Sequence, residues 1–123
     1  MGCAAVLKRH NPDIRCYVVE PEESAYLAGK SDKPSGHRIQ GGGYNMELPL
    51  LDRSLVTDFL TVSDGEAVEM TRALAKHEGV FAGPSSGANA AAAVKLLRTA
   101  EKGSSIAMTV NDSGMKYLST DIF

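Results

Sequence analysis

The sequence has only two cysteines and no long apolar run, and each of these shortages excludes a class of protein. Cys3 and Cys16 are too few for a disulfide framework and do not have the spacing of metal ligands, which favours a reducing compartment. The longest apolar stretches, such as residues 90–94, are far shorter than the roughly 18 residues that suggest a membrane span. Residues 1–20 contain no secretory hydrophobic region. We therefore expect a cytoplasmic protein with no membrane partner.

Neither sign of charge is in excess. Thirteen Lys and Arg residues against 15 Asp and Glu residues leave a net charge of −2, so the composition does not favour nucleic acid as a partner. His10, His37 and His77 have no partner at ligand spacing, and we predict no metal site. The chain is 43% hydrophobic and 23% charged, as in ordinary globular proteins, and 123 residues suffice for one domain with a genuine core.

Apolar periodicity and turn residues predict an alternation of strands and helices. We expect strands over residues 14–19, 58–62, 80–82 and 105–110. We expect helices over residues 3–10, 22–28, 64–78 and 86–101, with a long loop over 30–50. Ser63 and Glu66 predict a capping box, and Gly79 predicts a left-handed helix end. This order is typical of an α/β fold, a three-layer αβα arrangement with a mostly parallel sheet.

Two serines precede the alanine-rich helix. In parallel α/β sheets, ligands bind at the carboxyl ends of strands, where the next helix points its free amide N–H groups. Ser85 and Ser86 stand at such a place. Serine is also a common helix N-cap, so the local sequence alone fits a purely structural role as well as a functional one.

Five segments in order resemble landmarks in the second half of cysteine synthase and its relatives, which are pyridoxal-phosphate enzymes of fold type II. They are LKRHNPDI, VVEPEES, HRIQGGG, EGVFAGPSSGANAAAA and DSGMKYLST. The resemblance implies that residues 1–123 form a single partial domain, the C-terminal portion of the large domain of that fold. It also implies pyridoxal phosphate as the cofactor of the parent family. The implied reaction is β-replacement, in which O-acetylserine and sulfide give cysteine.

The resemblance assigns five residues to the cofactor site. Ser85 matches the serine that hydrogen-bonds the pyridine nitrogen, and Ser86 is its neighbour at the helix start. A neutral hydroxyl there does not favour a protonated ring, which suits β-elimination and β-replacement. Gly41 and Gly43 match glycines of a turn where a Cβ would obstruct the close approach of backbone to cofactor. Asp112 follows the last predicted strand, and we expect it behind the residues that touch the cofactor.

The family's Schiff-base lysine matches no lysine of this sequence, so we name no catalytic residue. We expect that the chain alone neither holds pyridoxal phosphate tightly nor catalyses β-replacement. Two alternatives remain open: a non-catalytic module that binds an anion or small ligand at the start of the 86–101 helix, and a self-assembling interaction protein. A sheet without its neighbours leaves unpaired edges and apolar faces, so we expect a homo-oligomer or a complex with a complementary fragment.

Overall fold

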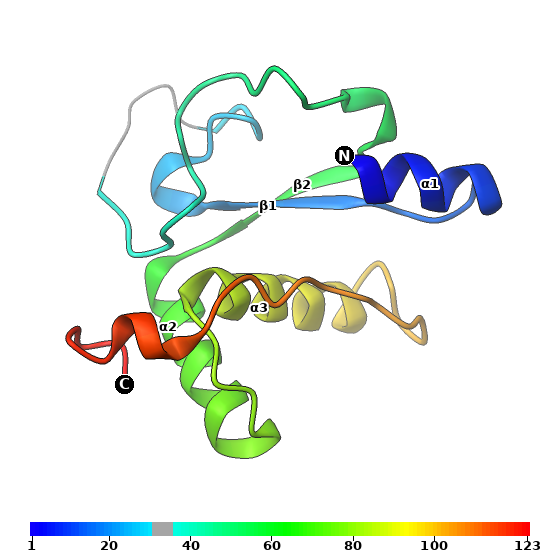
Figure 1. Ribbon diagram of the computed structural model, residues 1–123. Coiled ribbons are helices and arrows are strands. Elements are labelled where there is room, and N and C mark those ends of the chain that lie inside the picture. The colour runs from blue at the N-terminus through cyan, green and yellow to red at the C-terminus, as the bar shows by residue number, and fades with distance from the viewer. Residues whose placement is uncertain (31–35) are drawn as a thin grey trace.

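The computed structural model describes residues 1–30 and 36–123 of the chain. Three α-helices and two strands are assigned within them (Figure 1). They are α1 (Gly2–His10), β1 (Tyr17–Pro21), β2 (Asp58–Val62), α2 (Asp64–Ala73) and α3 (Pro84–Arg98). Short 3-10 turns occupy Glu22–Ser24, Arg53–Leu55 and Gly114–Tyr117, and a π-helical turn, Leu74–Glu78, extends α2. Residues 31–35 of the predicted long loop lie outside the described residues.

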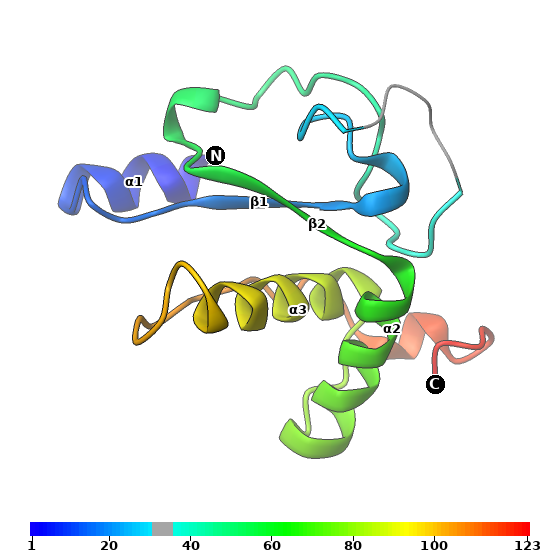
Figure 2. The same ribbon diagram turned by 180° about the vertical axis from the view of Figure 1, so that it is seen from behind.

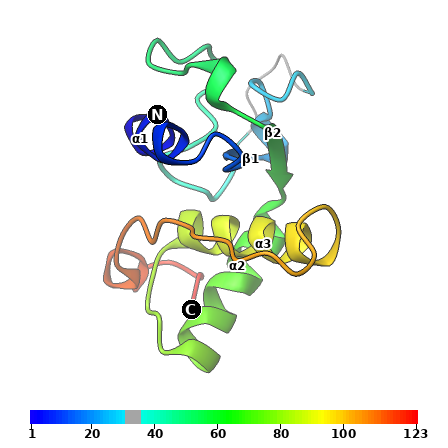
Figure 3. The ribbon, with the colours of Figure 1, turned by 90° about the vertical axis from the view of Figure 1, so that its right-hand side faces the viewer.

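The two strands pair in parallel, with Tyr17 opposite Asp58 and Pro21 opposite Val62. Helix α3 runs along one face of the strands, and α2 packs against the far side of α3 (Figures 1 and 2). Viewed along the strands, α1 lies level with them and apart from α2 (Figure 3). The parallel α/β character expected from the sequence is therefore confirmed.

Two predicted strands are wrong, and one is displaced. Among the described residues the sheet contains only β1 and β2. Residues 105–110 are not strand, and of residues 80–82 only Ala82 makes an isolated antiparallel bridge, to Ser113. A strand needs a neighbour that accepts its hydrogen bonds, and apart from the Ala82 bridge no described segment pairs with these apolar runs. Strand β1 begins three residues later than predicted and continues through Pro21.

The helix predictions over 3–10 and 64–78 are confirmed, and the latter ends at Gly79 with φ of 69°. The capping box is also present: the Ser63 hydroxyl accepts from the Glu66 amide, and the Glu66 carboxylate accepts from the Ser63 amide. The predicted helix over 22–28 is wrong beyond Ser24, because the buried Glu20 carboxylate accepts hydrogen bonds from the amides of Leu27 and Ala28. Helix α3 begins two residues earlier than predicted and ends at Arg98.

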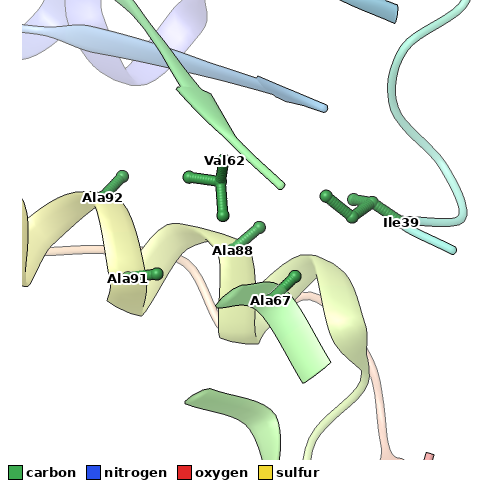
Figure 4. Close-up of a cluster of buried hydrophobic side chains, with 6 residues drawn as sticks. All are labelled: Ile39, Val62, Ala67, Ala88, Ala91 and Ala92. Carbon is green, nitrogen blue, oxygen red and sulfur yellow. The ribbon is translucent and has the colours of Figure 1, made fainter. Parts of the chain in front are cut away.

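The core lies between β2, α2 and α3. Figure 4 shows Val62 pointing from β2 toward the alanines of α3, with Ile39 at the edge. The cluster consists of Ile39, Val62, Ala67, Ala88, Ala91 and Ala92. Small side chains let the helices approach closely, and this contact fixes where the start of α3 lies relative to the carboxyl end of β1.

Candidate functional site

A small hollow opens where β1 ends and α3 begins, and we call it the Ser85 hollow. It has a volume of about 90 Å³. Its walls come from the end of β1, the 39–42 loop, the first two turns of α3 and the segment after residue 110. The lining residues are Val19, Glu20, Pro21, Ile39, Gly41, Gly42, Ser85, Ala88, Asn89 and Asn111. The hollow therefore has the placement at a strand's carboxyl end that ligand sites of parallel α/β sheets share.

Ser85 is the second residue of α3 and lines this hollow. Its hydroxyl has no hydrogen-bond partner in the part of the chain that the structure describes. The first turn of α3 itself carries no acidic side chain, and a helix start carries a partial positive charge. Ser85 is therefore free to donate to, or accept from, a ligand atom at this helix end.

Ser86 has the opposite environment. Its side chain is completely buried, and its hydroxyl accepts a hydrogen bond of 2.9 Å from the amide of Asn111. The residue does not line the Ser85 hollow. In this structure Ser86 joins α3 to the C-terminal segment.

The glycine turn lies across the hollow from α3. Gly41 has φ of 84°, and a Cβ there would meet no atom within 4 Å, so the space beside it is open. Gly43 has φ of 61°, but a Cβ there would come within 2.6 Å of His37 Nε2 and 2.8 Å of Pro21. Gly41 thus borders the open space of the Ser85 hollow, whereas a side chain at Gly43 would clash with the chain's own packing.

A second hollow, the Tyr44 hollow, adjoins the first and has a volume of about 170 Å³. Gly43 lines it together with Gly41 and Gly42, which also line the Ser85 hollow. The other lining residues are Val18, Val19, Glu20, Leu27, Tyr44, Met46 and Leu48. Gly41 and Gly42 are therefore shared by the two hollows, whereas Gly43 belongs to the Tyr44 hollow alone.

Asp112 lies behind the site. It does not line either hollow. Its Oδ2 accepts a hydrogen bond of 2.8 Å from the Tyr117 hydroxyl and lies 3.6 Å from Lys116 Nζ, while Oδ1 is buried without a partner among the described residues. Burial and this hydrogen bond raise the pKa of Tyr117 to about 12.

Sequence reasoning missed the three other polar residues that line the Ser85 hollow: Glu20, Asn89 and Asn111. Asn89 could have been found, because it stands four residues after Ser85 on the same helix face and interrupts a run of alanines. The Asn89 amide donates to the Thr109 carbonyl at 3.0 Å. Glu20 and Asn111 gave no local signal.

Other kinds of site have no support in the described ranges. No group of three potential metal ligands is present there. No described lysine lines the Ser85 hollow. Lys30 donates a hydrogen bond to the Thr61 hydroxyl on β2, and Lys95 pairs with Glu66. Lys33 lies outside the described residues. No described helix is long and apolar enough to span a membrane.

Comparisons with known proteins agree on one family. A family model described as "Pyridoxal-phosphate dependent enzyme" matches residues 1–112. Cysteine synthase 3 of Caenorhabditis elegans is 41% identical over 123 residues, and O-ureido-L-serine synthase of Streptomyces lavendulae is 36% identical over 122 residues. The crystal structure of a cysteine synthase from Entamoeba histolytica superposes with a TM-score of 0.92 at 35% identity.

The similarity covers 99% of this chain in each case, but a smaller share of each relative. The chain spans 36% of the nematode protein, 37% of the Streptomyces protein and 36% of the Entamoeba chain. The expected resemblance to cysteine synthase and the expected α/β fold are confirmed over this region.

Proposed function

The chain belongs to the pyridoxal-phosphate-dependent enzymes, and on that premise we propose that it forms one wall of a cysteine-synthase-type active site, with Ser85 as the contact to the cofactor's pyridine nitrogen. The observation that carries this proposal is the unpartnered Ser85 hydroxyl at the start of α3, facing a hollow at the end of β1. The reaction we propose is β-replacement, in which sulfide displaces acetate from O-acetylserine to give cysteine.

The residues present fit one edge of pyridoxal phosphate. A hydroxyl without an internal partner, open space beside Gly41 and a first helical turn that has no acidic residue of its own suit a neutral, flat heteroaromatic ring. The hollow of about 90 Å³ is smaller than the roughly 300–1,000 Å³ of typical cofactor sites. We therefore assign to these residues one wall of the site and not the whole of it.

When bound, pyridoxal phosphate withdraws electrons from the amino-acid substrate so that a group on its β-carbon can leave. Ser85 brings no negative charge to the ring nitrogen, in contrast to a carboxylate, and so does not favour its protonation. The amides of α3 add positive potential at the same edge.

We propose that the 123-residue chain needs a complementary part to act. One neutral hydrogen bond contributes about 1 kcal/mol, whereas even millimolar affinity needs roughly 4 kcal/mol. No described lysine reaches the Ser85 hollow to anchor the cofactor covalently. The purified chain should therefore lose added pyridoxal phosphate on desalting and form no cysteine from O-acetylserine and sulfide. A cofactor absorbance band that survives desalting, together with cysteine formation, would contradict this.

The role of Ser85 is tested in a hybrid in which these 123 residues replace the matching stretch of nematode cysteine synthase 3. Ser85→Asp should change the absorbance of the bound cofactor and lower cysteine formation, because a carboxylate favours a protonated ring. Ser119→Asp is the matched control, since Ser119 is exposed and lies outside both hollows. An unchanged cofactor spectrum in Ser85→Asp would refute the proposed contact.

The second candidate is a non-catalytic site for an anion or small ligand. The open first turn of α3 favours it, and the one carboxylate on the hollow, Glu20, is already engaged by two amides. Titration of the purified chain with inorganic phosphate, followed by NMR, distinguishes an anion site from the wall of a cysteine-synthase-type active site. Amide shifts confined to residues 85–88 would support an anion site.

Partners and location complete the proposal. We propose a homo-oligomer or a complex with a complementary fragment, supported by apolar side chains such as Leu50, Val110 and Leu118, which are 87%, 54% and 60% exposed. We also propose that the protein is located in the cytoplasm, because both of its cysteines are free thiols, as is usual in a reducing compartment. Subcellular fractionation tests the location.

A further inference from the structure

The start of α3 is held in place by the C-terminal segment, and not by a side-chain cap of its own. The N-cap residue is Gly83, which offers no side-chain acceptor. Residues 109–117 pack against this turn instead, and we call them the C-terminal clasp. The Gly83 amide donates to the Asp112 carbonyl at 3.3 Å, and the Gly114 amide donates to the Phe81 carbonyl at 3.1 Å. The residues just before Ser85 are thereby fixed to the clasp.

The clasp is itself braced by a hydrogen-bonded side-chain pair, the buried Tyr117 and the partly buried Asp112. Tyr117 is 5% exposed and donates its hydroxyl to Asp112. Both side chains rest on Gly83: a Cβ there would come within 2.3 Å of Asp112 Oδ1 and 2.4 Å of the Tyr117 ring. The pair therefore packs directly on the backbone two residues before Ser85, and any side chain at Gly83 would displace it.

The same clasp also forms a wall of the Ser85 hollow. Asn111 lines the hollow while its amide donates to the buried Ser86 hydroxyl, and Thr109 accepts from Asn89 on the next turn of α3. One segment thus contacts the N-cap residue Gly83 and the α3 residues Ser86 and Asn89, on both sides of Ser85. Because the clasp contacts the chain on both sides of Ser85, the position of Ser85 depends on these contacts.

From this geometry we infer that Tyr117, through Asp112, is a positioning residue that sets where Ser85 presents its hydroxyl. The inference rests on the proposed function of Ser85. It assigns a task to the family-like segment DSGMKYLST that the site itself leaves unexplained. Tyr117 and Asp112 touch neither hollow, so they act only through the turn that they hold.

The test compares Tyr117→Phe with Tyr44→Phe, which changes a 63% exposed tyrosine. In the purified chain, Tyr117→Phe should shift the NMR amide signals of residues 85–87, and Tyr44→Phe should not. Asp112→Ala should shift the same signals, whereas Asp112→Asn keeps an oxygen acceptor and should restore them. If Tyr117→Phe does not fold, the two Asp112 variants decide. Unmoved signals in Tyr117→Phe or Asp112→Ala would overturn the inference.

The hybrid with nematode cysteine synthase 3 tests the positioning role of Tyr117 separately from the proposed contact between Ser85 and the cofactor. Tyr117→Phe should change the cofactor spectrum as Ser85→Ala does, and lower kcat by roughly 10- to 100-fold with little change in KM, because misplacing a positioned group by a fraction of an ångström costs rate. A spectrum that responds to Ser85→Ala but not to Tyr117→Phe would overturn only the inference. A spectrum that responds to neither would overturn the proposed function.

Discussion

At the scale of single residues, neighbouring serines have opposite surroundings. The Ser85 hydroxyl borders a hollow and has no partner among the described residues, whereas the Ser86 hydroxyl is buried and accepts from Asn111. Successive helical residues point about 100° apart, so one of two adjacent side chains can face a ligand while the other faces the protein. The two positions should therefore respond differently to the same substitution.

Ser86→Ala should lower the free energy of unfolding by about 1 kcal/mol, because it removes a net-favourable hydrogen bond and leaves the Asn111 amide without its acceptor. Ser85→Ala, the matched control, should leave the free energy of unfolding nearly unchanged. Urea denaturation of the purified chain measures both. An equal loss of unfolding free energy in the two variants would contradict the structural role of Ser86 and the lack of an internal partner at Ser85.

Tyr117 gives the chain a pH dependence at the alkaline end. Burial and the hydrogen bond to Asp112 raise its pKa from 10.0 to about 12 in the folded state. The neutral phenol is thus favoured by folding, so its contribution is fully present below pH 10 and is lost as the pH rises toward 12. We expect the free energy of unfolding to fall across this interval, and Tyr117→Phe to make the fall shallower.

Tyr44→Phe is the control for this titration and should keep the original slope, since Tyr44 is exposed. Tyr17 adds to the slope as well, because its hydrogen bond to Glu101 raises its pKa. Tyr117→Phe should therefore remove part of the dependence. Denaturation curves between pH 9 and pH 12, roughly the span of these pKa values, measure it. The same slope with and without the Tyr117 hydroxyl would contradict the assignment.

At the scale of elements, the close contact of α2 with α3 depends on Gly87. A Cβ at Gly87 would lie 2.1 Å from Thr71 Oγ1 and 2.2 Å from the Ala67 carbonyl oxygen. Thr71 is buried and donates to that carbonyl, so neither atom can easily move. The distance between these helices also sets the position of the α3 start, and with it Ser85.

Gly87→Ala should lower the free energy of unfolding by about 1–3 kcal/mol, the usual cost of overpacking. Gly65→Ala in α2 is the matched control, because a Cβ there meets nothing within 4 Å and alanine favours helix. Thermal or urea denaturation distinguishes them. A Gly87→Ala variant as stable as the parent would show that the helices can separate without cost.

The elements that could be predicted are those defined by their own residues. Helix α2 has its capping box and its Gly79 end within the segment, and β2 matches residues 58–62. The strands predicted over 80–82 and 105–110 are absent because a strand also needs a partner, which the local pattern does not report. The helix predicted over 22–28 does not continue beyond Ser24, because the amides of Leu27 and Ala28 donate to the carboxylate of Glu20, a residue outside the segment.

At the scale of the whole molecule, α1 has no buried residue, and several large apolar side chains are exposed. They include Val6, Leu7, Leu50, Val110, Met115 and Leu118. Exposed apolar surface of this kind promotes association. We expect the purified chain to form oligomers whose mass rises with concentration, measured by light scattering. Leu50→Ser, at the 87% exposed position, should weaken association without lowering stability. A monodisperse monomer at every concentration would contradict the expectation.

The sequence by itself determined the family, the parallel α/β character of the fold, and the placement of Ser85 at a helix start, because helix caps, turn glycines and apolar periodicity are local properties of the chain. Only the tertiary structure decided which polar groups share the Ser85 hollow. It brought Glu20, Gly41, Asn89 and Asn111 around Ser85 and turned Ser86 toward the clasp. These contacts join residues far apart in the chain, and their geometry depends on how closely α2, α3 and β2 pack, which no single segment specifies.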